Sequence, residues 1–471
     1  MKILRISCVF GGFLSLVLSL SAQAFTTLQS SDGHHQLSDK RTSDDLDVGL
    51  GGESIASKGG VAVGEGETSI INPYDPNGSP FVEVGTTGAV ELTASDGVAG
   101  NTFGLTVAVS GNTVVVGEDC AEITGNRNCK KRRQSVYVYQ KSKSGWGQIA
   151  ELKPSDGSVG DQFGVALAIS GNTIVAGALN GKTYVFVKPD GGWKDMTETA
   201  QLTDPDTGNG GGISSESIDN RTIVVGVLTA TVNGNKYQGA AYVFVEPPTG
   251  WATTSVPNGE LTASDGSYFD LFGISVAVSG ETITVGAPFH HDQTGPGEVY
   301  LFEKPPTGWA NATQTATLTR SNAGPYDEFG LTVAINGNTV VVGAPQAVGE
   351  NNGQGVVDVF VKPSKGWSDR TENAELVAPI FIQHFGWSVA IEGVKVTVGT
   401  FSPNNVVFAY AKPSKGGWKS TSQPQTELMA GNGVGFFGFS VAMTDSIIVA
   451  GAPYETVNGE PDQGAAYLFN E

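Results

Sequence analysis

The sequence predicts an all-β protein, a β-propeller of four-stranded blades, and two observations carry this prediction. One is a repeated unit with a spacing of about 50–60 residues, which is typical of propeller blades and other stacked arrays. The other is composition: short runs rich in Val, Ile, Thr, Tyr and Phe alternate with Gly, Pro, Asn and Asp, which indicates strands and turns. No run of 11 or more residues shows apolar residues at the spacing of a helix. Clear copies of the unit begin at Phe103, Phe272, Phe329 and Phe437, and weaker copies begin at Gly51, Phe163, Gly211 and Phe385.

Each unit contains four segments that we expect to be strands. In the copy at Phe329, residues 329–336 (FGLTVAIN) form the first segment and residues 338–345 (NTVVVGAP) the second. Third segments resemble residues 298–302 (EVYLF), and fourth segments resemble residues 374–377 (AELV). The second segments are continuously apolar, which predicts strands buried on both faces. Radially stacked four-stranded sheets meet that condition.

The number of units predicts eight blades in a single domain that spans residues 35–471. The last unit ends at Phe469 after three segments, so its fourth strand must come from elsewhere. Residues 35–38 (HQLS) parallel the fourth segment at 200–203 (AQLT), and we expect them to supply that strand. Closure by an N-terminal strand would remove the exposed sheet edges that promote aggregation.

The first 24 residues predict a signal peptide. Lys2 and Arg5 precede an apolar run to about Leu20, and Ala22-Gln23-Ala24 has the form of an A-x-A cleavage site. The apolar run is too short for the alternative, a membrane anchor. A short segment, residues 25–34, then leads into the domain. We therefore expect a secreted, periplasmic or cell-surface protein with no membrane span after cleavage.

The repeated unit, with its Phe-Gly start, its Gly-Ala-Pro and its VYVF-like third segment, resembles the FG-GAP repeat of integrin alpha-subunit propellers and of bacterial FG-GAP proteins. The resemblance covers roughly residues 36–469. Propellers of the integrin type have seven blades, so the resemblance implies seven as the alternative to our count of eight. It also implies an exported protein that binds a partner, as in cell adhesion.

The resemblance does not extend to calcium binding. Family members often carry a D-x-D-x-D-G calcium loop between the first and second strands. Here that link is short, as in residues 110–113 (SGNT) and 279–282 (SGET). Such turns are too poor in oxygen atoms for Ca²⁺, which takes six to eight oxygen ligands. We expect no calcium and no other cofactor.

Cys120 and Cys129 are the two cysteines that would remain after signal cleavage, and both belong to one loop of the second unit. In an oxidising compartment we expect them to form a disulfide bond. The alternative, metal binding by two thiolates, lacks companion ligands nearby in the sequence. Arg127 and its basic neighbours make this loop a positively charged knob that could dock an anionic partner.

Tryptophan recurs at one turn of the unit, between the third and fourth segments. We interpret these residues as packing plugs; the alternatives are carbohydrate stacking and, more remotely, the tryptophan-docked blades of quinoproteins that hold PQQ. Six of the seven tryptophans follow glycine in this turn: Trp146, Trp193, Trp251, Trp309, Trp367 and Trp418.

Charge separates the two faces of the predicted ring. Links between the fourth and first segments are acidic, as at Asp96, Asp156 and Asp265, whereas the tryptophan turns carry lysines. We name the acidic side the top face. The net charge of −20 disfavours nucleic acid and anionic membranes as partners.

Binding is expected in the loops of the top face, because loops on a rigid scaffold commonly carry function. His290, His291 and Asp292 are of metal-ligand types, but adjacent side chains seldom reach one ion, so we predict no metal site there. His290 and His291 remain candidate binding residues.

The links into the last two units form the other candidate surface. They lose their acidic residues and contain Ile380, Phe381 and His384 in one link and Phe436 in the next. Exposed apolar side chains with a polar rim mark interaction sites. The alternative is that these side chains fold inward and cover the blade tops.

No catalytic motif is present: there is no G-x-S-x-G, H-E-x-x-H, P-loop or dinucleotide-binding fingerprint. We therefore expect no enzyme but an exported binding or adhesion scaffold that takes an extracellular or periplasmic protein or glycan on its top face. A carbohydrate-binding propeller is the second hypothesis. A glycoside hydrolase or lyase that uses top-face carboxylates is the third.

Overall fold

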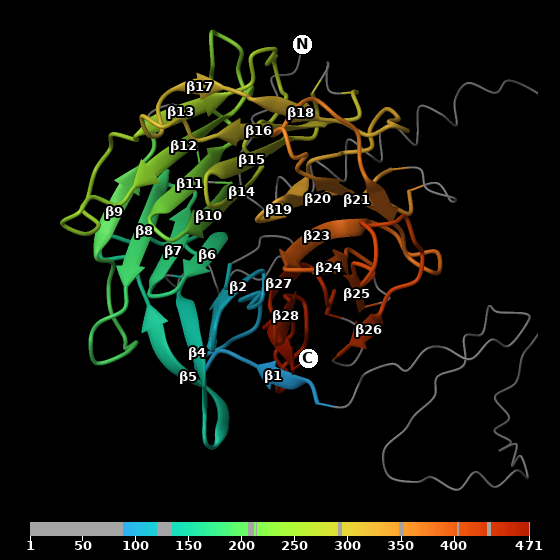
Figure 1. Cartoon of the computed structure of the whole chain (residues 1–471). Coiled ribbons are helices and arrows are strands. Elements are labelled where there is room, and N and C mark those ends of the chain that lie inside the picture. The colour runs from blue at the N-terminus through green and yellow to red at the C-terminus, as the bar shows by residue number, and fades with distance from the viewer. Residues whose placement is uncertain are drawn as a thin grey trace, which may run out of the picture.

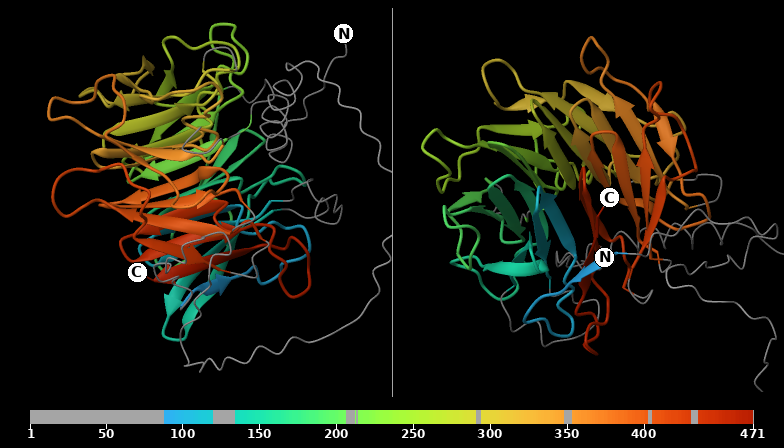
Figure 2. Two further views of the ribbon diagram at one scale, coloured as in Figure 1. Left: turned by 90° about the vertical axis from the view of Figure 1, so that its right-hand side faces the viewer. Right: turned by 60° about the horizontal axis from the view of Figure 1, so that its bottom comes forward.

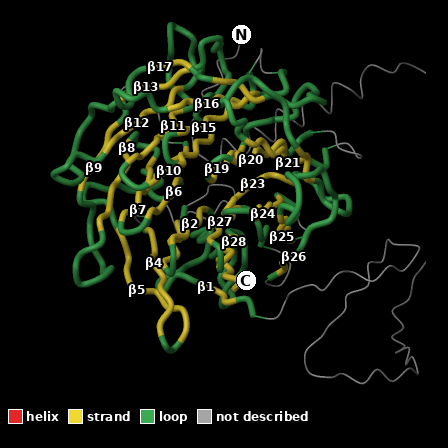
Figure 3. Tube along the Cα trace, in the orientation of Figure 1, coloured by secondary structure: helices red, strands yellow, loops and turns green. Residues whose placement is uncertain are grey.

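The computed structural model describes residues 88–119, 134–205, 212, 214–290, 294–347, 353–402, 405–430 and 435–470. These residues form strands and connecting loops without a helix (Figure 3). Accordingly, the described ranges hold no helical segment with the length and apolarity needed to cross a membrane.

The strands form seven sheets, which we number as blades 1 to 7 in chain order. Blades 1 and 2 consist of β2 (Thr106–Ser110), β3 (Thr113–Gly117), β4 (Val136–Ser142) and β5 (Gly145–Leu152), and of β6 (Ala166–Ser170), β7 (Thr173–Ala178), β8 (Lys182–Val187) and β9 (Ala200–Thr203). Blades 3 and 4 consist of β10 (Ser215–Asp219), β11 (Thr222–Val227), β12 (Ala240–Val245) and β13 (Gly259–Thr262), and of β14 (Ser275–Ser279), β15 (Thr282–Ala287), β16 (Glu298–Glu303) and β18 (Ala316–Leu318).

Blades 5 and 6 consist of β19 (Thr332–Asn336), β20 (Thr339–Ala344), β21 (Val356–Val361) and β22 (Ala374–Leu376), and of β23 (Phe385–Glu392), β24 (Lys395–Thr400), β25 (Val406–Ala411) and β26 (Thr426–Met429). Blade 7 consists of β27 (Ser440–Thr444), β28 (Ile447–Ala452), β29 (Ala465–Asn470) and β1 (Val90–Leu92).

The blades stand around a common centre, with the first strand of each blade innermost (Figure 1). Each inner strand contacts the inner strand of the next blade, and β2 of blade 1 contacts β27 of blade 7, so the ring is complete. Within a blade, successive strands pair antiparallel. The second strands are buried along nearly their whole length, as the continuous apolar runs predicted.

The predicted β-propeller is confirmed, and the described residues form seven blades, the alternative count, rather than eight. β1 supplies the fourth strand of blade 7 and pairs antiparallel with β29, Val90 opposite Leu468 and Leu92 opposite Ala466. Figure 2 shows the first and last described strands side by side. The edge that residues 35–38 were expected to fill is thus occupied by β1. Those residues, the unit at Gly51 and the predicted signal peptide lie outside the described residues.

The repeated glycines hold neighbouring blades together. The Ser275 hydroxyl of blade 4 donates a hydrogen bond of 2.8 Å to the Gly330 carbonyl of blade 5. A Cβ atom on Gly286 would lie only 2.0 Å from the same carbonyl oxygen, so only glycine permits this approach. The contact recurs where the ring closes, where the Ser440 hydroxyl donates to the Gly104 carbonyl over 2.8 Å. The recurrence of these glycines along the chain therefore reflects close packing between neighbouring blades.

The tryptophan turns also join the blades. Five of the six rings are buried, with exposed fractions of 6–8%, which supports the packing interpretation and leaves them no free face for a sugar. The chain after each buried ring then reaches the preceding blade. After Trp367, for example, Arg370 forms a parallel bridge with Leu318, and its amide donates to the Thr317 carbonyl over 3.1 Å. After Trp309, the short strand β17 (Ala312–Thr313) pairs with β13 in the same way.

Candidate functional site

Five aromatic side chains gather on the top face of blades 6 and 7, and we call them the aromatic cluster. Three of the rings form a stack: Phe401 lies 4.9 Å from Trp387 and 4.8 Å from Phe436, measured between ring centroids. Phe439 lies 5.8 Å from Trp387 and 5.9 Å from Phe401, and Tyr454 lies 5.6 Å from Phe436. All five are partly exposed.

The repeat explains how the backbone brings these rings together. Trp387 and Phe439 directly follow the Phe-Gly pairs of their blades, at the top of the inner strands. Phe401 stands where other units have the proline of Gly-Ala-Pro, and Tyr454 follows that proline in blade 7. Phe436 precedes the Phe-Gly pair with a φ of 53°, a left-handed conformation that few non-glycine residues adopt.

The structure places one of the predicted residues, His384, against this cluster, and another, Phe436, within it. His384 precedes the Phe-Gly pair of blade 6 with a φ of 57°, and its Nδ1–H donates to the Phe401 carbonyl over 3.0 Å. Its ring lies 6.2 Å from Trp387 and 5.9 Å from Phe401. Burial lowers the pKa of His384, so its ring is neutral at pH 7.

The other predicted residues of this sector, Ile380 and Phe381, lie on the surface in the link that leads into blade 6. Ile380 and Phe381 are 39% and 50% exposed, so they do not fold inward over the blade. Sequence reasoning missed Trp387, Phe401, Phe439 and Tyr454. The sequence does contain a signal for them. Trp387, Phe439 and Tyr454 directly follow a motif of the repeat, and Phe401 replaces the proline of Gly-Ala-Pro.

Many top-face acids have structural partners. The tyrosine of the third strand donates its hydroxyl to an aspartate of the preceding link in three blades. The pairs are Tyr137–Asp96 at 2.8 Å, Tyr184–Asp156 at 3.0 Å and Tyr300–Asp265 at 3.1 Å. A second aspartate in the link accepts from a backbone amide three residues earlier, as Asp161 does from Ser158 over 2.8 Å.

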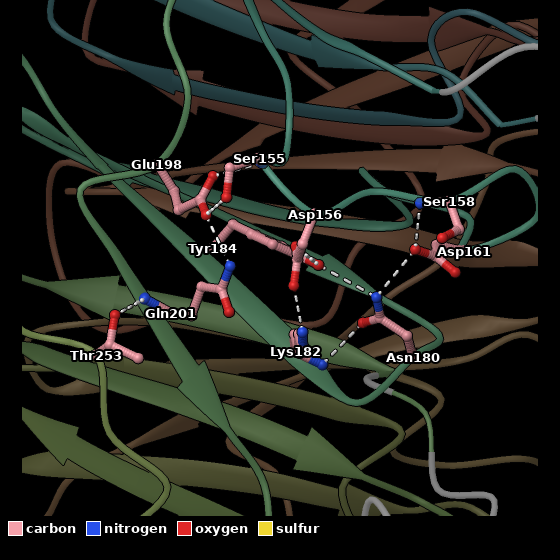
Figure 4. Close-up of polar contacts among 10 residues, drawn as sticks. All are labelled: Ser155, Asp156, Ser158, Asp161, Asn180, Lys182, Tyr184, Glu198, Gln201 and Thr253. Atoms are coloured by element: carbon pink, nitrogen blue, oxygen red, sulfur yellow. Dashed lines mark hydrogen bonds and ion pairs between the residues drawn. The ribbon is translucent and has the colours of Figure 1, made fainter.

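Figure 4 shows this arrangement in blade 2. Asp156 accepts from Tyr184 and from the ammonium of Lys182, while the Asn180 amide nitrogen donates to Asp161 over 3.2 Å and to the Tyr184 hydroxyl over 3.1 Å. Partial burial raises the pKa of Asp156, but the hydrogen bonds from Lys182 and Tyr184 outweigh it and bring the pKa below its ordinary value. The aspartate is therefore ionised and neutralised by a lysine.

In blade 5 an arginine compensates the negative charge of the acidic residues. Asp358 occupies the third-strand position that tyrosine holds in blades 1, 2 and 4. Arg320 donates to Asp327 over 2.5 Å, to Asp358 over 2.8 Å and to Glu375 over 2.9 Å. Arg320, Asp327 and Asp358 are buried, so this is a charge network inside the blade rather than a surface pair.

Blade 4 places a histidine among its carboxylates. His290 is 1% exposed; its Nδ1 lies 2.9 Å from Asp270, and its Nε2 lies 3.8 Å from Asp265 and 4.0 Å from Glu298. Burial lowers the pKa of His290, but Asp270 and the two other carboxylates outweigh it, so the pKa is raised. The structure thus gathers residues from two other segments around His290, whereas its sequence neighbours His291 and Asp292 lie outside the described residues.

Other predicted features also fall outside the described residues, namely the Cys120–Cys129 pair and the basic residues between and after them. Their disulfide stays a prediction.

Comparison with known proteins agrees with the repeat. A sequence model of the FG-GAP repeat matches residues 87–139, 146–186, 258–302, 312–360 and 425–469. None of the curated proteins compared with the chain matches it. Among solved structures, the crystal structure of the computationally designed Ika8 protein is similar at 14% identity and a TM-score of 0.42, over 81% of this chain and 99% of that one.

Proposed function

This chain is an FG-GAP repeat protein, and we propose that it is an exported, non-catalytic scaffold that binds a partner protein on its top face. The observation that carries the proposal is the partly exposed aromatic cluster of blades 6 and 7, together with the exposed Ile380 and Phe381 in the link that leads into blade 6. Aromatic side chains of this kind are enriched in protein interfaces and supply much of their binding energy.

The repeat itself does not require these aromatics. Blade 5 has Leu331, Pro345 and Gln346 at the positions that correspond to Trp387, Phe401 and Tyr454. Aromatic residues at several such positions in two adjacent blades therefore add apolar surface beyond what the fold needs. A concentrated, partly exposed apolar surface on a soluble protein favours an interaction site.

Export is part of the proposal and rests on the sequence of residues 1–24, with its basic start, apolar run and A-x-A site. The acidic net charge of −20 favours a protein partner over nucleic acid or an anionic membrane.

A glycan is the second candidate, because sugars stack on aromatic rings. One feature favours protein: Phe401 is stacked between Trp387 and Phe436, so both faces of its ring are occupied. The outer rings of the stack could still take a sugar. A hydrolase or lyase is less favoured, since Asp96, Asp156 and Asp265 already accept hydrogen bonds from tyrosines.

The test compares the double variant Phe381→Ser/Phe436→Ser with the parent protein and with Val256→Ser. Val256 is 74% exposed in a tryptophan-turn link on the opposite face, so its variant is a matched control. We expect the parent and the control to capture a partner from cell-surface extract and the double variant to lose it while thermal melts show that it remains folded.

Treatment of the extract separates the two candidates. Capture that survives deglycosylation but not protease digestion supports a protein partner, whereas the reverse result supports a glycan. Equal capture by the parent and the double variant would contradict the proposed surface.

A further inference from the structure

We propose that Asp265, His290 and Glu298 form a binding site for one divalent transition-metal ion, represented by Zn²⁺, on the top face of blade 4. The site is separate from the aromatic cluster of blades 6 and 7. It arises from three segments: the link before blade 4, the link after β15, and the start of β16.

The donor atoms lie at suitable distances from one another. His290 Nε2 is 3.8 Å from Asp265 Oδ2 and 4.0 Å from Glu298 Oε2, and one ligand atom from each residue lies within 4.8 Å of the others. Around a tetrahedral Zn²⁺, ligand atoms bound at about 2.0–2.2 Å lie about 3.4 Å from one another. Both distances from the histidine exceed this by about 0.4–0.6 Å, so the carboxylates must close in slightly when the ion binds. Asp265 is half exposed, so its side chain can adjust, and it leaves one side of the site open to water.

Hydrogen bonds orient two of the three ligands, as is usual around metal sites. Asp270 accepts from Nδ1–H of His290 over 2.9 Å, which directs Nε2 toward Asp265 and Glu298. Asp270 is itself held by the amide and hydroxyl of Ser267, each over 2.7 Å. Tyr300 donates to Oδ1 of Asp265 over 3.1 Å, which leaves Oδ2 facing the histidine.

Blade 2 provides an internal comparison, because it has the same frame with different groups (Figure 4). Its Asp156, Asp161 and Tyr184 correspond to Asp265, Asp270 and Tyr300. Asn180 donates to Asp161 as His290 does to Asp270, and Lys182 occupies the β-strand position of Glu298.

The differences between the two blades point to a cation. In blade 2 the ammonium of Lys182 binds Asp156 and supplies positive charge within the protein. In blade 4 a glutamate replaces that lysine, and a histidine one residue further along the loop takes the hydrogen-bonding role of the asparagine, so both differences introduce metal-ligand types. Three carboxylates then surround one buried histidine. Their negative charge would attract and hold a divalent cation.

The donor set indicates the class of metal. One imidazole nitrogen with two carboxylate oxygens suits Zn²⁺ and related transition metals. Ca²⁺ takes six to eight oxygen ligands, and the described side chains at this site offer it too few. The proposal therefore differs from the calcium loops considered in the sequence analysis, both in position and in metal.

The experiment uses the full mature chain, freed of metal with EDTA and then titrated with ZnCl₂ in a calorimeter. We expect one saturable site. The isosteric variants Asp265→Asn and Glu298→Gln should weaken Zn²⁺ binding by at least about tenfold, the lower end of effects at metal sites. Asp156→Asn, the matched change in blade 2, should leave Zn²⁺ affinity unchanged.

A second variant keeps the test informative if those substitutions disturb folding. His290→Asn/Glu298→Lys converts the blade 4 set into the one that blade 2 already uses, so it should fold and melt normally but bind no Zn²⁺. The proposal is overturned if the parent shows no saturable binding, or if this folded double variant binds Zn²⁺ as tightly as the parent.

Discussion

Gly286 illustrates how single residues of the repeat determine the distance between blades. The carbonyl oxygen of Gly330 in the next blade lies where a Cβ atom would project, 2.0 Å away, and Ser275 Oγ lies 2.5 Å away. Gly226 and Gly451 meet the Phe-Gly glycine of the following blade in the same manner. The motif could be recognised from sequence, whereas this reason for it depends on contacts between units.

Replacement of Gly286 by alanine should destabilise the protein. The added methyl group would overlap a backbone atom, which cannot rotate away as a side chain can, so the two blades must separate. Overpacking of this kind costs about 1–3 kcal/mol, and the melting temperature should fall accordingly. Gly147→Ala is the control, because a Cβ there would meet no atom within 4 Å. Equal melting temperatures for the two variants would show that the close contact is unimportant.

At the scale of elements, local patterns predicted much of the structure. The second strands were recognisable because both of their faces are buried, and the turns because Gly, Asn and Asp mark them. The aromatic cluster was predicted only in part. His384 and Phe436 stood out by composition of their links, but Trp387 and Phe401 are separated along the chain and meet only through the blade geometry.

The blade 4 site shows the same limit. Sequence reasoning paired His290 with its neighbours, because adjacency is all that a single sequence displays. The antiparallel arrangement of the blade instead brings Asp265 and Glu298 to it from other segments. The prediction that residues 290–292 form no metal site therefore did not consider His290 together with Asp265 and Glu298.

Blade 5 allows a test of whether its buried charged residues can be exchanged for the residues that another blade has at the same positions. Arg320→Ala should leave Asp327 and Asp358 buried without their cation, and loss of one partner of such a network costs about 3–5 kcal/mol. Arg320→Ala/Asp358→Tyr introduces into blade 5 the alanine and tyrosine that blade 4 has at the corresponding positions, Ala263 and Tyr300.

The double variant should recover part of the lost stability, because it removes Asp358, one of the two buried carboxylates that lose their cation, while Asp327 remains. Thermal melts of the parent, both single variants and the double variant measure the coupling. If the two substitutions prove simply additive, the arginine and the aspartate do not depend on each other.

At the scale of the whole molecule, the number of blades was the property least accessible to sequence. The decayed copy at Gly51 counted as an eighth unit, and residues 35–38 were expected to supply the closing strand that β1 forms. The segment around β1 has the pattern of an ordinary fourth strand, as in residues 260–264. Nothing within such a strand says which third strand it will pair with, because that depends on the size of the ring.

Closure by β1 predicts that a few residues near position 90 control the stability of the entire ring. Leu92 is 3% exposed and packs in a cluster that joins blade 7 to blade 1, with Val116 and Leu468 among its members. Leu92→Asp would bury an unpaired carboxylate there, which is strongly unfavourable, and would detach β1 from β29.

Because each blade contacts only its neighbours around the ring, loss of this closure should expose the edge of β29 and lower the melting temperature of the whole protein. Aggregation through the freed edge is expected as well. Glu91→Lys is the control, since Glu91 lies on the same strand but is exposed. A Leu92→Asp protein that melts like Glu91→Lys and stays monomeric would show that the ring is held without β1.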